Sequence, residues 1–224
     1  MARLIDKIIT VFAKLKKNRV IKQTDIKLNL GAGLQVAKNW INIDGSYNAF
    51  FSHFPVFFLK KIYTFSGANK YYSKNEYIKI LKENTFIHHD LKYGIPVKDN
   101  SCDFIFSSHF LEHLPHSDAA YLLKEMFRCI KKNGVVRIAV PNLEYAVNLY
   151  QKGEKENFLK FFFTETANLY EHHHYMYDFE IIENMLKKAG FRKIYKRNYQ
   201  QGLVPDIEIL DNRPEETLFI EAVK

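Results

Sequence analysis

Two glycines and a carboxylate near the start of the chain are the first residues whose types and spacing could do chemistry. Residues 28–44 read L-N-L-G-A-G-L-Q-V-A-K-N-W-I-N-I-D, with Gly31 and Gly33 after one apolar stretch and Asp44 at the end of the next. Glycines let a backbone approach a ligand closely, and a carboxylate accepts strong hydrogen bonds from both hydroxyls of a ribose. The stretch therefore indicates a site for a cofactor that contains a nucleoside.

The spacing disfavours a dinucleotide. A dinucleotide-binding motif has a third glycine, a helix aimed at the pyrophosphate, and an acid about 20 residues further on. Here Val36 stands in the third position, and Asp44 follows Gly31 by 13 residues. The residues between Gly33 and Trp40 allow only about one or two helical turns. A cofactor without phosphate does not need that helix, so NAD and FAD fit poorly.

Two more polar residues follow apolar stretches in the same way. Asp90 comes after residues 86–89, and Ser108 ends residues 103–108. Ligands of open parallel sheets bind outside the carboxyl ends of the strands. We therefore expect Gly31, Asp44, Asp90 and Ser108 to lie at one edge of a sheet.

Histidines near this edge are the candidate general bases, because histidine most often serves in that role. His109 and His113 flank Glu112, and His173 lies in the run 172–174. The alternative interpretation gives Glu112 and His113 a purely structural role and makes the histidine run a solvated loop or lid. No metal is expected there, because successive side chains point in different directions and cysteine partners are lacking.

Hydrophobic periodicity supplies the elements that must position these residues. Strands are predicted at 27–31, 40–44, 86–89, 103–108, 135–140, 191–199 and 217–223, and helices at 117–132, 143–151, 155–170 and 179–189. Gly134 is predicted just past the end of the 117–132 helix, and Asp178 is expected to cap the last helix. Strands separated by helices imply an α/β fold with a mostly parallel sheet of seven strands. The last strand pair has no intervening helix, which predicts an antiparallel C-terminal hairpin strand.

Composition and charge bound the other possibilities. The chain has 224 residues, 47% of them hydrophobic and 26% charged, with a net charge of +8. Residues 1–27 carry +6 and residues 51–82 carry +5, which leaves −3 for the rest. No apolar run approaches the ~20 residues of a membrane span, and the N-terminus does not resemble a signal peptide. The two cysteines, Cys102 and Cys129, are expected to be reduced and partly buried, and the protein to be cytoplasmic.

The positive charge lies in two peripheral segments. Residues 1–26 have the spacing of an amphipathic basic helix, and residues 45–85 are an aromatic, basic insertion that is expected to be helical. Either segment packs on the domain or contacts a membrane surface, with residues 1–20 and 50–65 as the contact regions. If these segments contact a membrane surface, the protein is expected to lie at the inner face of the membrane.

Outside residues 1–26 and 45–85, the sequence resembles the class I S-adenosylmethionine-dependent methyltransferases, and most closely the small bacterial type with a methyltransferase-11-like domain. The motifs K-L-N-L-G-A-G, N-W-I-N-I-D, H-D-L and I-P-V-K-D-N-S-C-D-F-I-F-S-S-H-F-L-E-H-L carry the resemblance, followed by H-H-Y-M-Y-D, K-A-G-F and L-F-I-E-A-V-K. It covers residues 27–44 and 86–223, and it implies a Rossmann-like methyltransferase domain over 27–224 with helices on both faces. One departure is Gln35, which stands where many members have a third glycine.

The resemblance also implies the site. S-adenosylmethionine would be the cofactor and S-adenosylhomocysteine its product. The residues implied to bind it are Asn29, Gly31, Ala32 and Gly33 at the methionine part, Asp44 at the ribose, Asp90 and Leu91 at the adenine, and Ser107, Ser108 and His109 at the methyl end.

The function predicted is methyl transfer to a small-molecule, glycan or lipid-linked acceptor, with oxygen preferred as the acceptor atom. One alternative is a methyltransferase-like binding protein that acts through its basic helices at a membrane or in an assembly. A second is an RNA methyltransferase, although no RNA-binding module is visible and nucleic acid is the less favoured partner. The sequence does not predict the oligomeric state.

Overall fold

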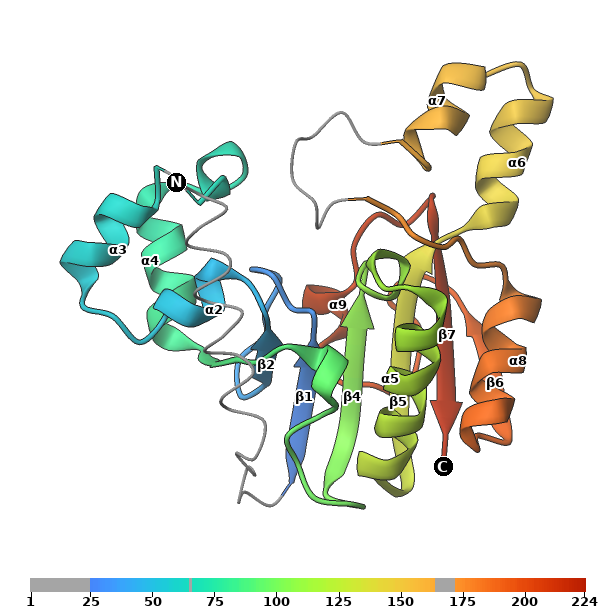
Figure 1. Cartoon of the computed structure of the whole chain (residues 1–224), viewed down its shortest axis with the longest axis horizontal. Helices are drawn as coiled ribbons and strands as arrows, with labels where there is room; N and C mark the ends of the chain where they lie inside the picture. The colour runs from blue at the N-terminus through green and yellow to red at the C-terminus, as the bar shows by residue number, and fades with distance from the viewer. Residues whose placement is uncertain (1–24, 65, 164–171) are drawn as a thin grey trace.

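A sheet of seven strands forms the centre of the molecule (Figure 1). The computed structural model describes residues 25–64, 66–163 and 172–224. The N-terminal helix predicted for residues 1–26 therefore lies almost wholly outside the described residues. The strand order is β3-β2-β1-β4-β5-β7-β6. The strands are β1 (Ile26–Leu30), β2 (Ile41–Asp44), β3 (Thr85–His88), β4 (Cys102–Ser108), β5 (Ile130–Pro141), β6 (Lys193–Arg197) and β7 (Thr217–Val223).

The direction of the strands matches the sequence prediction. The pairs β3-β2, β2-β1, β1-β4 and β4-β5 are parallel, and β7 runs antiparallel to both β5 and β6. The carboxyl ends of five successive parallel strands consequently meet at one edge of the sheet, which is the upper edge in Figure 1.

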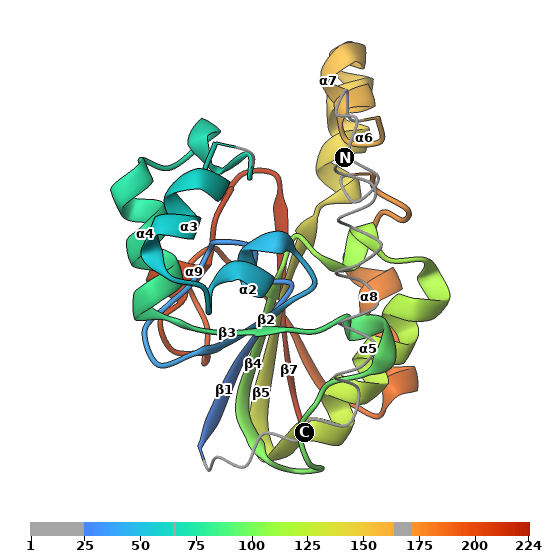
Figure 2. The ribbon, with the colours of Figure 1, turned by 60° about the vertical axis from the view of Figure 1, so that its left-hand side comes forward.

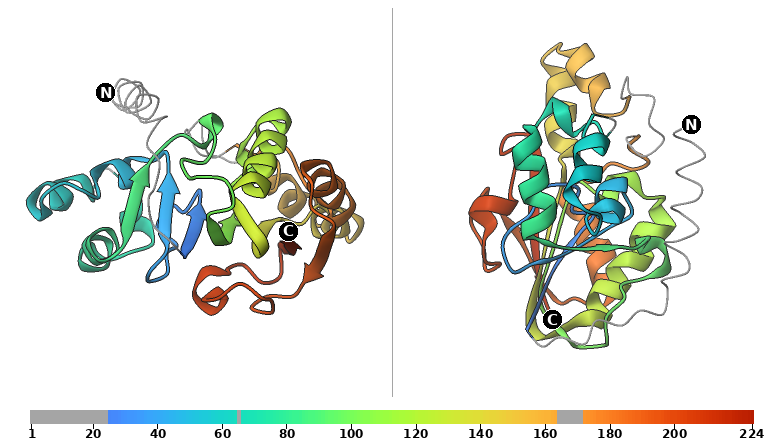
Figure 3. Two further views of the ribbon diagram at one scale, coloured as in Figure 1. Left: turned by 90° about the horizontal axis from the view of Figure 1, so that it is seen from below. Right: turned by 90° about the vertical axis from the view of Figure 1, so that its left-hand side faces the viewer.

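Helices cover both faces of the sheet (Figure 3). On one face, α5 (His116–Cys129) and α8 (Phe179–Ala189) bury their apolar sides, and Ile105 of β4 belongs to this core. On the other face lies α9 (Ile207–Leu210), whose core includes the next residue of β4, Phe106. Alternate side chains of a strand point to opposite faces, so β4 is buried on both sides. The predicted α/β fold with two helical layers is confirmed.

Residues 45–85 form a lobe beside the β3 edge. It contains α2 (Tyr47–Phe51), α3 (Val56–Ile62), a 3-10 turn η1 (Ala68–Lys70) and α4 (Lys74–Glu83). Its small core packs Leu59 and Tyr77 against Phe86 of β3. Ser73 and Glu76 form a reciprocal capping box at the start of α4, so the polar residues needed to begin this helix are local.

Two predicted helix boundaries are wrong, and the first has a physical reason. The helix α5 ends at Cys129, and β5 begins at once with Ile130, so Gly134 is a strand residue and not a helix terminator. A β-carbon at Gly134 would lie 2.9 Å from the carbonyl oxygen of Asp103. The glycine therefore serves close strand approach at an irregular stretch of the β4-β5 pairing.

The second boundary concerns the segment predicted as one helix over 155–170. The helix α7 covers only Lys155–Lys160, and residues 164–171 lie outside the described part. With α6 (Leu143–Gln151), it extends away from the sheet beyond the carboxyl end of β5 (Figure 2). None of the helices in the described residues is long and apolar enough to cross a membrane.

Candidate active site

The glycine turn leaves β1 in a conformation that other residues rarely adopt. Gly31 has φ +66° and Gly33 has φ +52°, with buried Ala32 between them. A β-carbon at Gly31 would lie 2.2 Å from Cγ of Phe110, whereas one at Gly33 would meet nothing within 4 Å. The turn therefore has one side covered by the Phe110 ring and the other open, as close approach of a ligand to the backbone requires.

Asp44 closes this turn from the end of β2. Its Oδ2 accepts a hydrogen bond from the Gly33 N–H at 2.8 Å, and its Oδ1 accepts one from the Ser46 N–H at 2.6 Å. The residue is 9% exposed. A carboxylate has about four acceptor positions, so two remain for the hydroxyls of a ribose. The carboxylate is also held in place by the backbone that would border the ligand.

The side chain of Asn29 makes hydrogen bonds within the protein. Its amide is buried in β1 and donates to the carbonyl of Gln35 at 2.8 Å and to Oδ1 of Asn42 at 3.0 Å. These bonds fix the returning end of the glycine turn on the sheet. Asn29 is therefore placed to position the turn.

Asp90 and Leu91 lie beside Asp44 because β2 and β3 are parallel and in register. Asp44 pairs with His88, and the His89 N–H donates to the Asp44 carbonyl. Oδ1 of Asp90 accepts a hydrogen bond from the Lys92 N–H, and Leu91 is buried. The two predicted cofactor carboxylates thus stand at neighbouring strand ends.

The two serines at the end of β4 behave differently. Oγ of buried Ser107 donates to the carbonyl of Leu30 at 3.1 Å, which ties β4 to β1 immediately before the glycine turn. Oγ of Ser108 is buried and has no hydrogen-bond partner among the described residues. Of the two, Ser108 is the one with a polar atom still to be satisfied.

His109 stands between a carboxylate and a hydroxyl. Its Nδ1 lies 3.4 Å from Oε1 of Glu112, and its Nε2 lies 3.0 Å from Oγ1 of Thr217 at the start of β7. A carboxylate favours the tautomer with the proton on Nδ1, which leaves Nε2 as the basic nitrogen. His109 also has φ +47°, a backbone conformation that costs on the order of 1 kcal/mol or more for a residue other than glycine.

His113 and His173 complete a cluster around Glu112, although 60 residues separate them. Nε2 of His113 lies 3.9 Å from Oε1 of Glu112, and the two histidine rings are 5.1 Å apart. Burial lowers the pKa of His173 below its usual value, against the opposing effect of the negative charge on Glu112. All three predicted catalytic histidines therefore meet in one place, at the edge of the sheet where Asp44 and Asp90 lie.

Three residues of this site had no signal in the sequence. Thr217 contacts His109 from the last strand, Phe110 covers Gly31, and the carbonyl of Phe161 receives a hydrogen bond from Nδ1 of His173 at 2.5 Å. The Phe161 contact joins residues that are 12 apart in the sequence, and the Thr217 contact joins residues that are 108 apart. Only the fold makes such contacts visible.

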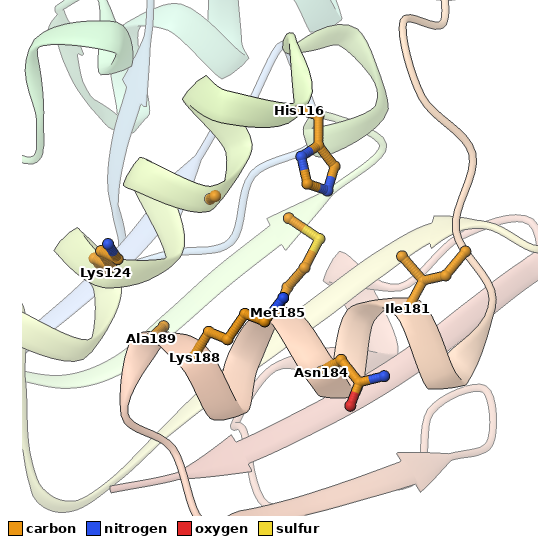
Figure 4. Close-up of a pocket in the computed structure, with 8 residues that line it drawn as sticks. His116, Lys124, Ile181, Asn184, Met185, Lys188 and Ala189 are labelled. Atoms are coloured by element: carbon orange, nitrogen blue, oxygen red, sulfur yellow. The ribbon is translucent and has the colours of Figure 1, made fainter.

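Two hollows lie near these elements. A pocket of about 110 Å³ is lined by His173 together with Pro141, Lys160, Phe161, Arg213 and Glu216. A groove of about 210 Å³ runs between α5 and α8, with His116, Lys124 and Lys188 along it (Figure 4). The groove lies within the helical layer, whereas the smaller pocket adjoins the histidine cluster.

Comparison with known proteins gives the family. The model of the methyltransferase domain family matches residues 31–196. The chain therefore belongs to this family. No curated protein matches the sequence significantly.

Solved structures share the fold at low sequence identity. A SAM-dependent methyltransferase from Archaeoglobus fulgidus is 17% identical, with a TM-score of 0.51 over 100% of this chain and 95% of that one. A protein from Thermotoga maritima, described as a SAM-dependent methyltransferase and possible histamine N-methyltransferase, is 15% identical, with a TM-score of 0.50 over 98% and 91%. A possible exported protein from Bordetella parapertussis is 10% identical, with a TM-score of 0.53 over 97% and 67%.

Family and fold together define a class I, S-adenosylmethionine-dependent methyltransferase, as the sequence predicted. The residues present fit this cofactor. The open side of Gly33, the remaining acceptor positions of Asp44 and the unsatisfied hydroxyl of Ser108 all lie at the carboxyl ends of the strands. Which residues contact the cofactor stays a prediction.

Proposed function

We propose that this methyltransferase acts on a hydroxyl group of a small-molecule, glycan or lipid-linked acceptor. S-adenosylmethionine supplies a methyl group on a sulfonium: a carbon–oxygen bond forms, the carbon–sulfur bond breaks with its electron pair left on sulfur, and S-adenosylhomocysteine remains. The protein must align the two partners, which contributes about 7–11 kcal/mol in favourable cases. It must also accept the proton of the hydroxyl.

The observation that best supports the proposed cofactor-binding site is the hydrogen bonding of Asp44. The carboxylate is fixed by the N–H groups of Gly33 and Ser46, and it keeps acceptor positions for two hydroxyl donors. Asp90 at the next strand end supplies a second acceptor for an amino group of the base. These two carboxylates support the proposal of a nucleoside cofactor, because the hydroxyl and amino groups of a nucleoside donate hydrogen bonds.

His109 supports an oxygen acceptor. With its Nδ1 proton facing Glu112, its Nε2 can take the hydroxyl proton, and the carboxylate stabilises the imidazolium that forms. A positioned base of this kind is worth about 10²–10⁴-fold in rate. His113 and His173 are the alternative bases, since both rings lie beside the same carboxylate.

The residues around the histidine cluster and on the insertion support an acceptor molecule that has a polar group and an apolar lipid part. Lys160 and Arg213 line the pocket beside His173. On the insertion, Phe57 and Phe58 of α3 are 57% and 42% exposed, and the neighbouring Lys60 and Lys61 are exposed too. Exposed aromatics next to lysines suit an interface with anionic lipid. We therefore propose membrane-surface contact through residues 50–65, which favours the lipid-linked form of the acceptor.

Calorimetric titration with S-adenosylhomocysteine tests the cofactor site. Asp44→Ala should weaken binding at least tenfold, because two charge-assisted hydrogen bonds to the ribose are lost. Asp103→Ala is the matched control: this carboxylate lies at the opposite end of β4, paired with Lys131, and its loss should leave binding unchanged. Equal binding by both variants would refute the ribose assignment.

The acceptor is tested by turnover with radiolabelled S-adenosylmethionine on small-molecule, polysaccharide, lipid and RNA fractions of the host. Label should enter a non-RNA fraction, as a methyl ether, and His109→Asn should lower kcat by about 10²-fold or more, a larger change than in S-adenosylhomocysteine affinity. Label in RNA would establish the RNA methyltransferase alternative. Cofactor binding without label in any fraction would establish the binding-protein alternative.

A further inference from the structure

We propose that Glu112, His113 and His173 form a binding site for a divalent transition-metal ion. One ligand atom of each residue lies within 4.8 Å of the other two. Glu112 and His113 come from the turn η3 (Leu111–His113) after β4, and His173 comes from the loop that precedes α8. The sequence of neither segment predicts the site by itself, because only the fold brings His173 close to Glu112 and His113.

The first argument is the burial of Glu112. Its side chain is 0% exposed, and neither carboxylate oxygen has a hydrogen-bond partner among the described residues. The nearest ring nitrogens, Nδ1 of His109 at 3.4 Å and Nε2 of His113 at 3.9 Å, do not meet hydrogen-bond geometry with it. Burying a charged carboxylate without compensation is very unfavourable. Buried charges in proteins are paired or coordinate metals, so this carboxylate calls for a positive charge in direct contact with it.

The second argument is the hydrogen bonding of the two histidines. Nδ1 of His113 lies 3.2 Å from the carbonyl oxygen of His172, and Nδ1 of His173 lies 2.5 Å from that of Phe161. A carbonyl only accepts hydrogen bonds, so both Nδ1 atoms carry the proton. In the neutral form of each ring, Nε2 is then bare. Metal-binding histidines almost always have this arrangement, with the other ring N–H donated to a carbonyl or carboxylate.

These two arguments meet in the contact between Nε2 of His113 and Oε1 of Glu112. The two atoms are 3.9 Å apart, and both are acceptors. An ionised carboxylate and a bare Nε2 that face each other repel unless a proton or a metal ion lies between them. The ligand set of two imidazoles and one carboxylate suits Zn²⁺ or Fe²⁺ better than Mg²⁺ or Ca²⁺, which prefer oxygen ligands.

The loop that carries His173 is already fixed near the other ligands. The carbonyl of Glu112 accepts hydrogen bonds from the N–H groups of His174 at 2.7 Å and of Tyr175 at 3.3 Å. Metal–ligand bonds of about 2.0–2.2 Å require ligand atoms about 3.5 Å apart. The side chains therefore need to close by about 1 Å, which ring rotation and small shifts can supply.

The site has room for one more ligand. His173 also lines the pocket of about 110 Å³ that contains Lys160 and Arg213. Catalytic zinc sites have three protein ligands and an open position. This part of the inference rests on the proposed function. The acceptor oxygen would bind the metal ion at the open position, and the ion would lower the pKa of the acceptor hydroxyl.

Cobalt titration of the full-length chain tests the site. After removal of bound metal by a chelator and dialysis, Co²⁺ should bind at one equivalent per chain, with a ligand-field absorption that Zn²⁺ abolishes by competition. His173→Gln should weaken Co²⁺ binding at least tenfold. His174→Gln is the matched control, because this neighbouring side chain is exposed and its loss should change the affinity less than twofold.

Glu112→Gln gives a second measurement from the other segment, and circular dichroism checks that each variant is folded. Binding well below one equivalent by the unmodified chain would overturn the proposal, and so would equal weakening by His173→Gln and His174→Gln. Calorimetry with S-adenosylhomocysteine on the same samples separates the two proposals. Loss of metal binding alone refutes this inference, whereas loss of cofactor binding in the unmodified chain refutes the proposed function.

Discussion

Replacing Arg137 with alanine should destabilise the protein more than any surface substitution. Arg137 lies in the middle of β5 and is 0% exposed. Its guanidinium donates to both carboxylate oxygens of Asp211 at 2.9 and 2.6 Å, and to Oε1 of Glu221 at 3.3 Å. It also donates to the carbonyls of Asn198 and Gln201. These bonds attach the segment that carries α9 to the centre of the sheet.

The expected magnitude follows from what the substitution leaves behind. Asp211 and Glu221 are both 0% exposed at their side chains. Without Arg137, the buried Asp211 carboxylate would lose its counter-charge, whereas Glu221 would keep Arg197 at 2.9 Å. Removing one partner of a buried ion pair costs about 3–5 kcal/mol. For a chain of this length, 1 kcal/mol shifts Tm by about 2–4 °C. The variant should therefore melt about 6–20 °C lower.

Thermal and urea denaturation followed by circular dichroism measure this loss. Lys131→Ala is the matched control on the same strand, because it removes a partly exposed ion pair with Asp103, and ion pairs near the surface contribute about 0–1 kcal/mol. Arg137→Lys keeps the charge but loses the fork geometry, so it should fall between the two. A loss of less than 1 kcal/mol in Arg137→Ala, equal to that of the control, would refute the reasoning.

Two further predictions concern groups whose pKa is shifted. Burial raises the pKa of Cys102 to about 11 and raises that of Cys129 further, so neither thiol should react with a disulfide reagent at pH 8 until urea unfolds the chain; rapid reaction of the folded protein would contradict this. The second group is Glu125. Burial by itself would raise the pKa of this carboxyl, but hydrogen bonds from Arg128 and a backbone N–H hold the pKa below its usual value. Glu125 therefore stabilises the folded state above the unfolded pKa of about 4.3, and this contribution is lost as pH falls through the lower folded pKa. Glu125→Gln should cost about 1.5–3 kcal/mol at pH 7 in urea denaturation, and the difference from the unmodified protein should shrink below about pH 4; a difference independent of pH would show that the ion pair is not its source.

The sequence predicted the features that depend on local pattern. Strands with continuous apolar residues, the helix cap at Asp178 and the acids after β2 and β3 lie where periodicity placed them. Cys102 and Cys129 are buried and free, as expected. These features are recoverable because each is encoded within about ten neighbouring residues.

Features that depend on distant residues were not recoverable. The stretch V-V-R-I-A-V predicts a buried strand, but nothing near Arg137 shows that Asp211 and Glu221 make its burial possible. The histidine run gave the same difficulty. No metal was expected from residues 172–174, because successive side chains point in different directions and cysteine partners are lacking. The two other ligands of the proposed site are 60 or more residues away in the sequence.

Gln35 shows how the fold gives meaning to a departure from a motif. It is not among the residues with positive φ, so its position does not require glycine. Its carbonyl accepts the Asn29 amide, and its side-chain amide donates to the carbonyl of Ile209 in α9. No helix follows the glycine turn, and the Gln35 side chain joins this turn to α9, which Asp211 and Arg137 anchor to the sheet.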